Sequence, residues 1–326
     1  MAGADPTRWP AGGLTAALEE RARAALACGA LRPIETEQAE IYDGGVRFLV
    51  RVVSSLARKA EDRERVPVGA PANPFLPPEP ELTVGSPSET HVAVLNKFNV
   101  LERHLLIVTR AFQYQETLLT PQDFHALFVC MAQMPSLGFY NGGAQAGASQ
   151  PHKHLQLVPL PLAPVGLAVP MAPLLVPLFA PGLVAGEGVC PGLPFRHAFG
   201  RLSRPVEADP ALVREAHGLY HRLLDALGIR GIQFEDGLRQ SAPYNLLVAD
   251  DWLLAVPRVA ECFGSVSVNA LGFAGSLFVK DRERLAEVRA AGPMAVLRAG
   301  NSWYDRMVAA RRKPTPAEQQ RRQALN

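Results

Sequence analysis

Apolar residues recur along this chain at two spacings, one typical of helices and the other typical of strands. Positions three and four residues apart predict helices over residues 15–29, 120–134 and 209–228, and another that begins at Asp281. Short apolar runs predict strands over residues 41–56, 91–110 and 244–258, and another that ends at Val279. The first run has a Gly-Gly turn near its start, the second is two strands, and the third is a hairpin turning at Asp250-Asp251. This mixture predicts the α+β class with antiparallel sheets.

Capping residues mark the ends of two predicted helices. Thr15 is placed as the N-cap of the first helix, and Gly29 follows it at the C′ position. Thr120 is the N-cap of the second helix, with Pro121 at the first helical position and Asp123 near the positive end of the helix dipole. Both helices therefore have a predicted start.

An uncharged apolar segment from Leu155 to Gly186 has the length of a membrane span. Each proline inside a helix costs about 3 kcal/mol, and this segment contains Pro159, Pro161, Pro164, Pro170, Pro173, Pro177 and Pro181. A spanning helix is therefore excluded, and we expect a strand that continues into a long extended connection.

A segment in the second half of the chain is similar in sequence to one in the first half. HLLIVTR at residues 104–110 and WLLAVPR at 252–258 are both apolar strands that end in a basic residue. This similarity is compatible with a duplicated unit that consists of a strand hairpin and a helix. We expect an N-terminal half, a proline-rich connection, a C-terminal half and a disordered tail over residues 1–165, 166–205, 206–310 and 311–326.

Composition narrows the class of protein. Of 326 residues, 48% are hydrophobic and 20% are charged, which is typical of a globular protein. The net charge of +2 argues neither for nor against a nucleic-acid partner. No basic block contains interleaved aromatic residues, so we expect no such partner. The four cysteines form no CxxC pair, and the N-terminus resembles no signal peptide. We therefore expect a cytoplasmic protein with reduced cysteines and no membrane partner.

The candidate chemistry lies in HKHLQ, residues 152–156. On a strand, His152, His154 and Gln156 share one face, while Lys153, Leu155 and Leu157 share the other, mostly apolar face.

Three hypotheses compete for the two histidines. They are part of a solvated strand face, or they bind zinc, or one imidazole attacks phosphorus while its neighbours hold the oxygens. Zinc needs a third strong ligand and Gln156 stands in its place, so we expect no metal on this strand. The preceding Gly/Ala/Ser-rich run at residues 141–150 favours the third hypothesis, because its backbone N–H groups can approach an anion closely. A neutral imidazole near pH 7 needs no separate base.

The segment ASQPHKHLQ, preceded by FYNGGAQAG, resembles the diadenosine tetraphosphate phosphorylases (ATP adenylyltransferases), the HxHxQ branch of the histidine-triad (HIT) superfamily. NPF at 73–75, LNKFNV at 95–100, HLLIVTR, YNLLV with WLLAVPR, and VNALGFAGSLFVK up to Lys280 extend the similarity over most of the chain. The resemblance implies a HIT-like fold of two related antiparallel half-barrel units with flanking helices, as in hexose-1-phosphate uridylyltransferase-like folds.

The resemblance also implies roles for single residues. His154 would be the nucleophile that takes AMP from Ap4A, and phosphate would then accept the AMP to give ADP beside ATP. Gln156 would assist the transfer, and His152 would support the nucleophile or the phosphate. The implied nucleotide or phosphate contacts are Lys59 (with Arg58 as its rival), Asn96, Lys97, Asn141, Gly147, Ala148, Ser149, Gln150, Asn269, Ala270, Leu271 and Lys280.

We also have expectations for the cofactor and the oligomeric state, and several alternative activities stay open. The substrate's charge implies an accompanying divalent cation, Mg²⁺, and we expect a monomer with no tightly bound cofactor. A related HxHxQ transferase or phosphorylase acting on a nucleotide sugar uses the same chemistry, so base and acceptor stay open. A metal-dependent hydrolase would need a further ligand, and a nucleotide sensor would have no use for His154.

Overall fold

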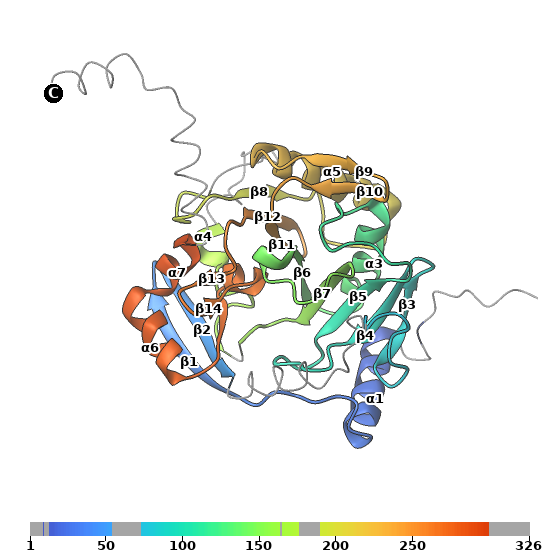
Figure 1. Ribbon diagram of the computed structural model, residues 1–326, viewed down its shortest axis with the longest axis horizontal. Helices are drawn as coiled ribbons and strands as arrows, with labels where there is room; N and C mark the ends of the chain where they lie inside the picture. Colours follow the sequence, from blue (N-terminus) through green and yellow to red (C-terminus); the bar gives the residue numbers. More distant parts are fainter. Residues whose placement is uncertain (1–8, 10–12, 54–72, 164, 176–189, 300–326) are drawn as a thin grey trace, which may run out of the picture.

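One antiparallel sheet of eight strands runs through the protein (Figure 1). The computed structural model describes residues 9, 13–53, 73–163, 165–175 and 190–299. In sheet order the strands are β3 (Thr83–Ser88), β4 (His91–Leu95), β5 (Leu105–Thr109), β7 (His154–Pro159), β6 (Ser136–Gly142), β11 (Tyr244–Val248), β12 (Trp252–Pro257) and β8 (Ala198–Arg201). The hairpins β4–β5 and β11–β12 confirm the strands predicted at 91–110 and 244–258. Strands β3 and β8 lie at the edges of the sheet and were not predicted.

A second sheet has three strands, β1 (Thr36–Asp43), β2 (Val46–Val53) and β15 (Ser276–Val279). The predicted Gly-Gly turn is Gly44-Gly45, where both residues have positive φ. The predicted strand included only residues 41–43 of β1, because the side chains of β1 are mostly exposed or half-buried and carry little apolar signal. Strand β15 pairs with β2 in parallel, so the expectation of antiparallel sheets fails at this one pair. Its partner lies more than 200 residues earlier in the chain, and no hairpin imposes an antiparallel direction.

Helices cover both sheets. Helices α1 (Gly13–Ala27), α3 (Pro121–Met131) and α5 (Pro210–Ala226) pack on one face of the large sheet. Beside the small sheet lie α6 (Arg282–Ala291) and α7 (Pro293–Ala299) (Figure 1). The shorter elements are η1 (Ala144–Ala146), α4 (Ala172–Leu175), η3 (Ala270–Ala274) and the hairpin strands β9 (Gly231–Phe234), β10 (Gly237–Gln240), β13 (Cys262–Phe263) and β14 (Val266–Ser267).

Most of the predicted caps are present. Thr120 and Asp123 form a capping box at the start of α3, and Asp281 caps α6. Helix α1, however, begins at Gly13, so the assignment of Thr15 as its N-cap is wrong. The backbone N–H of Leu14 donates instead to Oε1 of Gln133 at 2.8 Å. A side chain more than 100 residues away thus satisfies this helix end, and no local pattern could reveal it.

The two faces of the large sheet bury separate hydrophobic clusters. Leu155 and Leu157 of β7 belong to the cluster under α1, α3 and α5. Val158 belongs to the cluster that also holds residues of β2, β15 and η3. Because side chains alternate along a strand, His154 and Gln156 face the second side, toward the small sheet.

Strands from both predicted halves pair within the large sheet, where β6 pairs with β11. The domain boundaries at residues 165 and 205 stay a prediction. After β7 the chain forms the short helix α4 inside the proline-rich connection, and the end of that connection contains the edge strand β8. Residues 176–189 of the connection lie outside the described residues, as does the tail from Arg311. Among the described residues, no helix is both long and apolar enough to cross a membrane.

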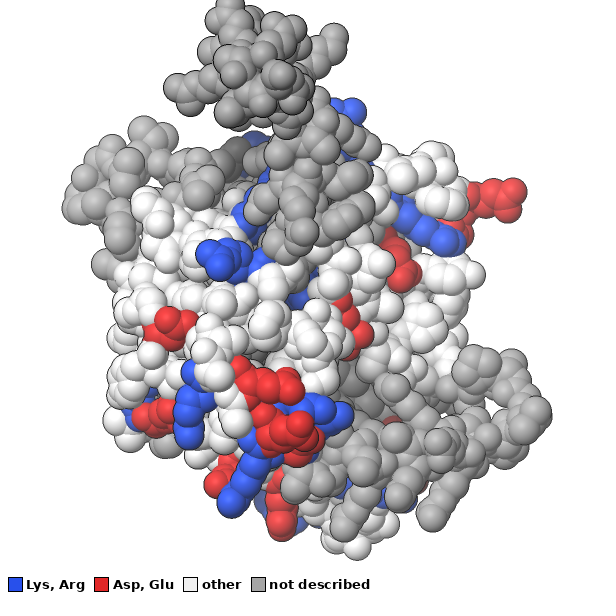
Figure 2. Space-filling model, turned by 60° about the vertical axis from the view of Figure 1, so that its left-hand side comes forward, with Lys and Arg blue, Asp and Glu red and all other residues white. Residues whose placement is uncertain are grey.

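Acidic and basic side chains are mixed on the face that carries β1 and α6 (Figure 2). Arg282 of α6 pairs there with Glu37 of β1 at 2.9 Å, and both side chains are exposed. Opposite charges that alternate in this way form exposed ion pairs, which contribute little to stability.

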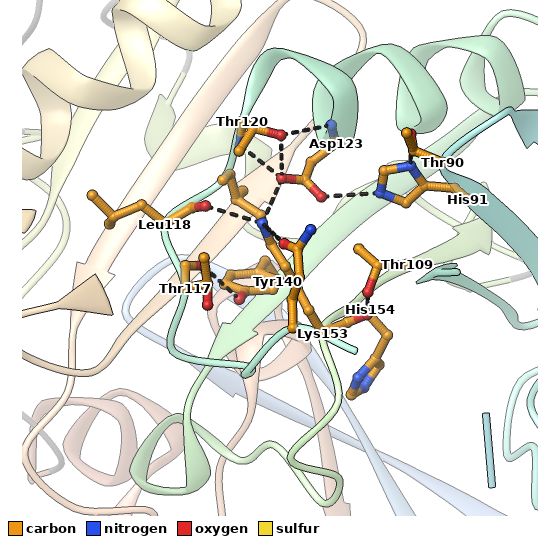
Figure 3. Close-up of polar contacts among 12 residues, drawn as sticks. Thr90, His91, Thr109, Thr117, Leu118, Thr120, Asp123, Tyr140, Lys153 and His154 are labelled. Atoms are coloured by element: carbon orange, nitrogen blue, oxygen red, sulfur yellow. Dashed lines mark hydrogen bonds and ion pairs between the residues drawn. The ribbon is translucent and has the colours of Figure 1, made fainter. Parts of the chain in front are cut away.

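Lys153, directly before β7, is a charged residue on the face of the HKHLQ segment that was expected to be mostly apolar. It is fully buried, and its Nζ lies 2.6 Å from Oδ2 of Asp123 and 3.0 Å from the carbonyl oxygen of Leu118. His91 lies 3.0 Å from the other oxygen of Asp123. Burial alone would raise the pKa of Asp123, but the charge of Lys153 and the bond from His91 outweigh it and lower the pKa well below its usual range. The ion pair therefore anchors the strand to the N-terminus of α3 (Figure 3).

We expect Lys153→Met to lower the free energy of unfolding by about 3–5 kcal/mol, because it leaves the buried carboxylate of Asp123 without its partner. Arg282→Met is the control, since it breaks the exposed pair with Glu37 and should cost less than about 1 kcal/mol. Urea unfolding at neutral pH measures both. Equal losses in the two variants would show that the buried pair does not anchor the strand.

Candidate active site

A cavity of about 440 Å³ opens between the large sheet and the small sheet. This volume lies within the range of small-molecule sites. His154 and Gln156 of β7 line it, together with Phe278 of β15 and Val53 of β2. The cavity thus begins on the polar face of the predicted HxHxQ strand.

The ring of His154 has a defined proton. Its Nδ1 lies 2.8 Å from the carbonyl oxygen of His152. A carbonyl only accepts, so Nδ1 carries the hydrogen, and in the neutral ring the lone pair is on Nε2. Burial lowers the pKa of His154 to about 4. Near neutral pH the residue therefore presents an uncharged nitrogen nucleophile at the cavity wall.

The backbone of His154 is fixed by the buried amide of Gln115. The Oε1 of Gln115 accepts from the His154 N–H at 2.9 Å, and its Nε2 donates to the carbonyls of Asn141 and His154 at 2.9 and 3.2 Å. Strands β6 and β7 pair only as far as Phe139 and Gln156, and this side chain bridges them beyond that point. The Gln115 amide thus fixes the position of the His154 backbone.

His152 precedes β7 and does not line the cavity. Its Nε2 lies 2.8 Å from the carbonyl oxygen of Thr109, and its Nδ1 lies 3.0 Å from Nδ2 of Asn73. The ring of Phe75 packs against His152 and His154, with centroids 5.7 and 5.4 Å away, so both rings lie on the same side. The contact of His152 with the nucleophile runs through its carbonyl oxygen.

Gln156 and Asn141 are amides whose oxygens are already bonded. Oε1 of Gln156 lies 2.9 Å from Nε2 of His104. Oδ1 of Asn141 accepts from Nδ2 of Asn245 at 2.8 Å and from the backbone N–H of Ala270 at 2.9 Å. Both residues line the cavity, and each therefore has its NH₂ group available to donate to a ligand.

The run 141–150 contributes fewer backbone donors than its composition suggested. The N–H groups of Ala146, Gly147 and Ala148 donate to carbonyls within the loop. Those of Ser149 and Gln150 have no acceptor among the described residues, and both residues line the cavity. Gly147 has φ of +90°, and a Cβ there would lie 2.9 Å from that of Asn269, so this position requires glycine.

The other predicted contacts fall into three groups. Asn96, Lys97, Asn269 and Leu271 line the cavity, and Nζ of Lys97 pairs with Glu79 at 2.8 Å. Ala148, Ala270 and Lys280 do not line the cavity, and Lys280 is exposed. Lys59 and its rival Arg58 lie outside the described residues.

Several residues that support the site were not predicted. They are Asn73, Phe75, His104, Gln115, Asn245 and Arg258. Buried Arg258 donates to Oδ1 of Asn245 at 2.7 Å and thereby orients the amide that bonds to Asn141. The motif NPF contained a local signal for one of these supports, since the Asn73 side chain accepts from the N–H two residues later and forms an Asx-turn.

Two family models match consecutive parts of the chain. The Ap4A phosphorylase N-terminal domain matches residues 5–177, and the ATP adenylyltransferase C-terminal domain matches residues 191–300. The chain therefore belongs to the Ap4A phosphorylase (ATP adenylyltransferase) family.

Individual relatives agree with this assignment. Protein APA1 of Saccharomyces cerevisiae is 27% identical over 83% of this chain and 88% of its own length. Diadenosine 5′,5′′′-P1,P4-tetraphosphate phosphorylase 2 of the same yeast is 27% identical over 73% of this chain and 78% of its own length. The crystal structure of yeast Ap4A phosphorylase Apa2 in complex with AMP has a TM-score of 0.67 at 25% identity, covering 87% of this chain and 94% of that one.

We expect histidine ¹⁵N NMR spectra to show His154 with its proton on Nδ1 and the ring uncharged at neutral pH. With a pKa of about 4, only about a tenth of the rings would be charged at pH 5. The loss of one signal set in His154→Asn identifies the residue. A proton on Nε2, or titration near the ordinary pKa of about 6.5, would contradict the structure.

Proposed function

We propose that the protein catalyses the reversible phosphorolysis of Ap4A, in which Ap4A and phosphate give ATP and ADP. The observation that carries this proposal is the orientation of His154, whose uncharged Nε2 faces the cavity. The names of the yeast relatives support the substrate.

In the first step, the lone pair of His154 Nε2 attacks the phosphorus of one terminal adenylate. A bond forms between Nε2 and phosphorus, and the bond from phosphorus to the bridging oxygen breaks, so that ATP leaves. An oxygen of inorganic phosphate then attacks the same phosphorus. The Nε2–P bond breaks, ADP leaves, and the imidazole is free again.

The low pKa of His154 supports this route. A ring with its usual pKa would be partly charged near neutral pH and would then lack the attacking lone pair. Burial keeps the ring neutral, and its Nδ1 proton stays on the bond to His152. No separate base is needed, and the ATP that leaves is already a stabilised anion.

Neutral donors stabilise the charge on the reacting phosphoryl group. We assign this role to the NH₂ groups of Gln156 and Asn141 and to the backbone N–H groups of Ser149 and Gln150. Donors already aimed at the oxygens need no reorganisation in the transition state, and losing one typically costs 10² to 10³ in rate. His152 acts as a positioning residue, through its carbonyl oxygen.

The nucleotide itself occupies the remaining wall of the cavity. Asn96, Lys97, Asn269 and Leu271 contact it, and Lys59 and Lys280 are assigned to the outer phosphates. We further propose that Mg²⁺ accompanies the polyphosphate as part of the substrate, since this ion prefers phosphate oxygens and water over protein cages.

Product analysis with and without phosphate tests the reaction. We expect Ap4A to be consumed beyond one equivalent of enzyme only when phosphate is present, with ATP and ADP formed in equal amounts. Steady turnover in phosphate-free buffer, giving two ADP or AMP and ATP, would show a hydrolase instead. A requirement for a sugar phosphate would show the related nucleotidyltransferase.

We expect His154→Ala to lower turnover at least about 10³-fold, because the covalent route has no substitute nucleophile. Labelled Ap4A without phosphate should leave an acid-labile AMP on the wild-type protein and none on this variant. Lys280→Ala is the matched comparison, since it removes an outer contact and should retain the labelled protein. Near-normal turnover by His154→Ala would refute the assignment.

A further inference from the structure

The direction of the hydrogen bonds behind Gln156 is set by one backbone N–H. The N–H of Phe98 lies 3.3 Å from Oδ1 of Asn96. A backbone N–H only donates, so this oxygen accepts, and the amide of Asn96 must point its Nδ2 the other way. Nδ2 lies 3.2 Å from Nδ1 of His104.

The tautomer of His104 in turn determines the orientation of the Gln156 amide. Because Nδ2 of Asn96 donates, Nδ1 of His104 accepts, and the proton of the neutral ring is on Nε2. That Nε2 lies 2.9 Å from Oε1 of Gln156 and donates to it. The amide of Gln156 is thereby turned with its oxygen toward His104 and its NH₂ group free for the cavity, which both residues line.

A second series of hydrogen bonds, with the same arrangement, runs through His152. The N–H of Phe75 donates to Oδ1 of Asn73 at 3.0 Å, and Nδ2 of Asn73 lies 3.0 Å from Nδ1 of His152. The Nε2 of His152 then donates to the Thr109 carbonyl at 2.8 Å. In both series an Asn-x-Phe turn supplies the donor that determines a histidine tautomer.

We propose that His104 is a positioning residue for the reaction and acts by holding the Gln156 amide as a donor to the reacting phosphoryl group. This proposal rests on the function proposed above. A reversed amide would aim its carbonyl oxygen at the negatively charged phosphoryl oxygens and oppose the developing charge. His104 therefore controls the sign of the dipole that Gln156 presents, without touching the substrate phosphorus.

A double-mutant cycle separates this role from simple packing. His104→Phe keeps an aromatic ring but removes the donor, and we expect kcat to fall at least about tenfold while KM changes less than about twofold. In a Gln156→Ala background the same change should alter kcat less than about twofold, because the group that it orients is gone. His104→Gln, whose amide donates from a similar position, should recover most of the lost activity in the wild-type background. His197→Phe is the matched control, since it removes an equally buried histidine near the far edge strand β8 and should leave kcat unchanged.

A measurement without turnover accompanies the cycle. Histidine ¹⁵N spectra of the free protein should show His104 with its proton on Nε2. The proposal is overturned if His104→Phe lowers kcat equally in both backgrounds, if His197→Phe lowers it as much, or if the proton is on Nδ1. Wild-type protein that does not turn over Ap4A with phosphate would instead refute the proposed function, and the NMR result would still decide the orientation of Gln156.

Discussion

The hydrogen bond from Nδ1 of His154 to the carbonyl oxygen of His152 is the interaction on which the site depends. It leaves the lone pair of the neutral ring on Nε2, at the wall of the cavity. The acceptor belongs to the backbone two residues earlier, so the bond exists only while the chain keeps its local conformation. Gln115 holds that conformation from the side of β6, and the bonds of the His152 ring to Asn73 and Thr109 hold it from the other.

The same stretch of chain serves stability and chemistry on opposite faces. Lys153 reaches the N-terminus of α3, where Asp123 is both its ion-pair partner and, with the N-cap Thr120, a member of the capping box. The ring of His154 points away from this pair (Figure 3). A buried ion pair adds little net stability compared with apolar packing, but it is strongly directional, because a slipped strand would leave two charges unpaired. A shift of one residue would also turn the histidine away from the cavity, so the pair protects the register that the chemistry needs.

The sequence pattern correctly predicted the features that depend on residues close together in the chain. The capped helix α3, the hairpins β4–β5 and β11–β12, and the shared face of His154 and Gln156 all follow from spacing within a few residues. Three other features depend on residues far away in the chain. They are the hydrogen bond from Gln133 that satisfies the start of α1, the parallel pairing of β15 with β2, and the partner of Lys153. His104 was overlooked for a similar reason, since its meaning comes from Gln156 on the neighbouring strand. The resemblance to the family supplied the roles of the candidate residues, while the geometry supplied the directions of their hydrogen bonds.

The groups that we assign to the reacting phosphoryl group share one property, which is that they are uncharged. The amides of Gln156 and Asn141 can offer hydrogens only because their oxygens are occupied by His104, Asn245 and the N–H of Ala270. A carboxylate beside His154 would raise its pKa and reduce the attacking form, whereas a neutral amide leaves the ring unprotonated. In the proposed mechanism two needs are therefore met separately: burial keeps the His154 ring neutral for attack, and oriented dipoles stabilise the charge that the attack would produce. Backbone groups at the ends of these hydrogen-bond series fix the direction of every bond in them, because an N–H cannot become an acceptor and a carbonyl cannot become a donor.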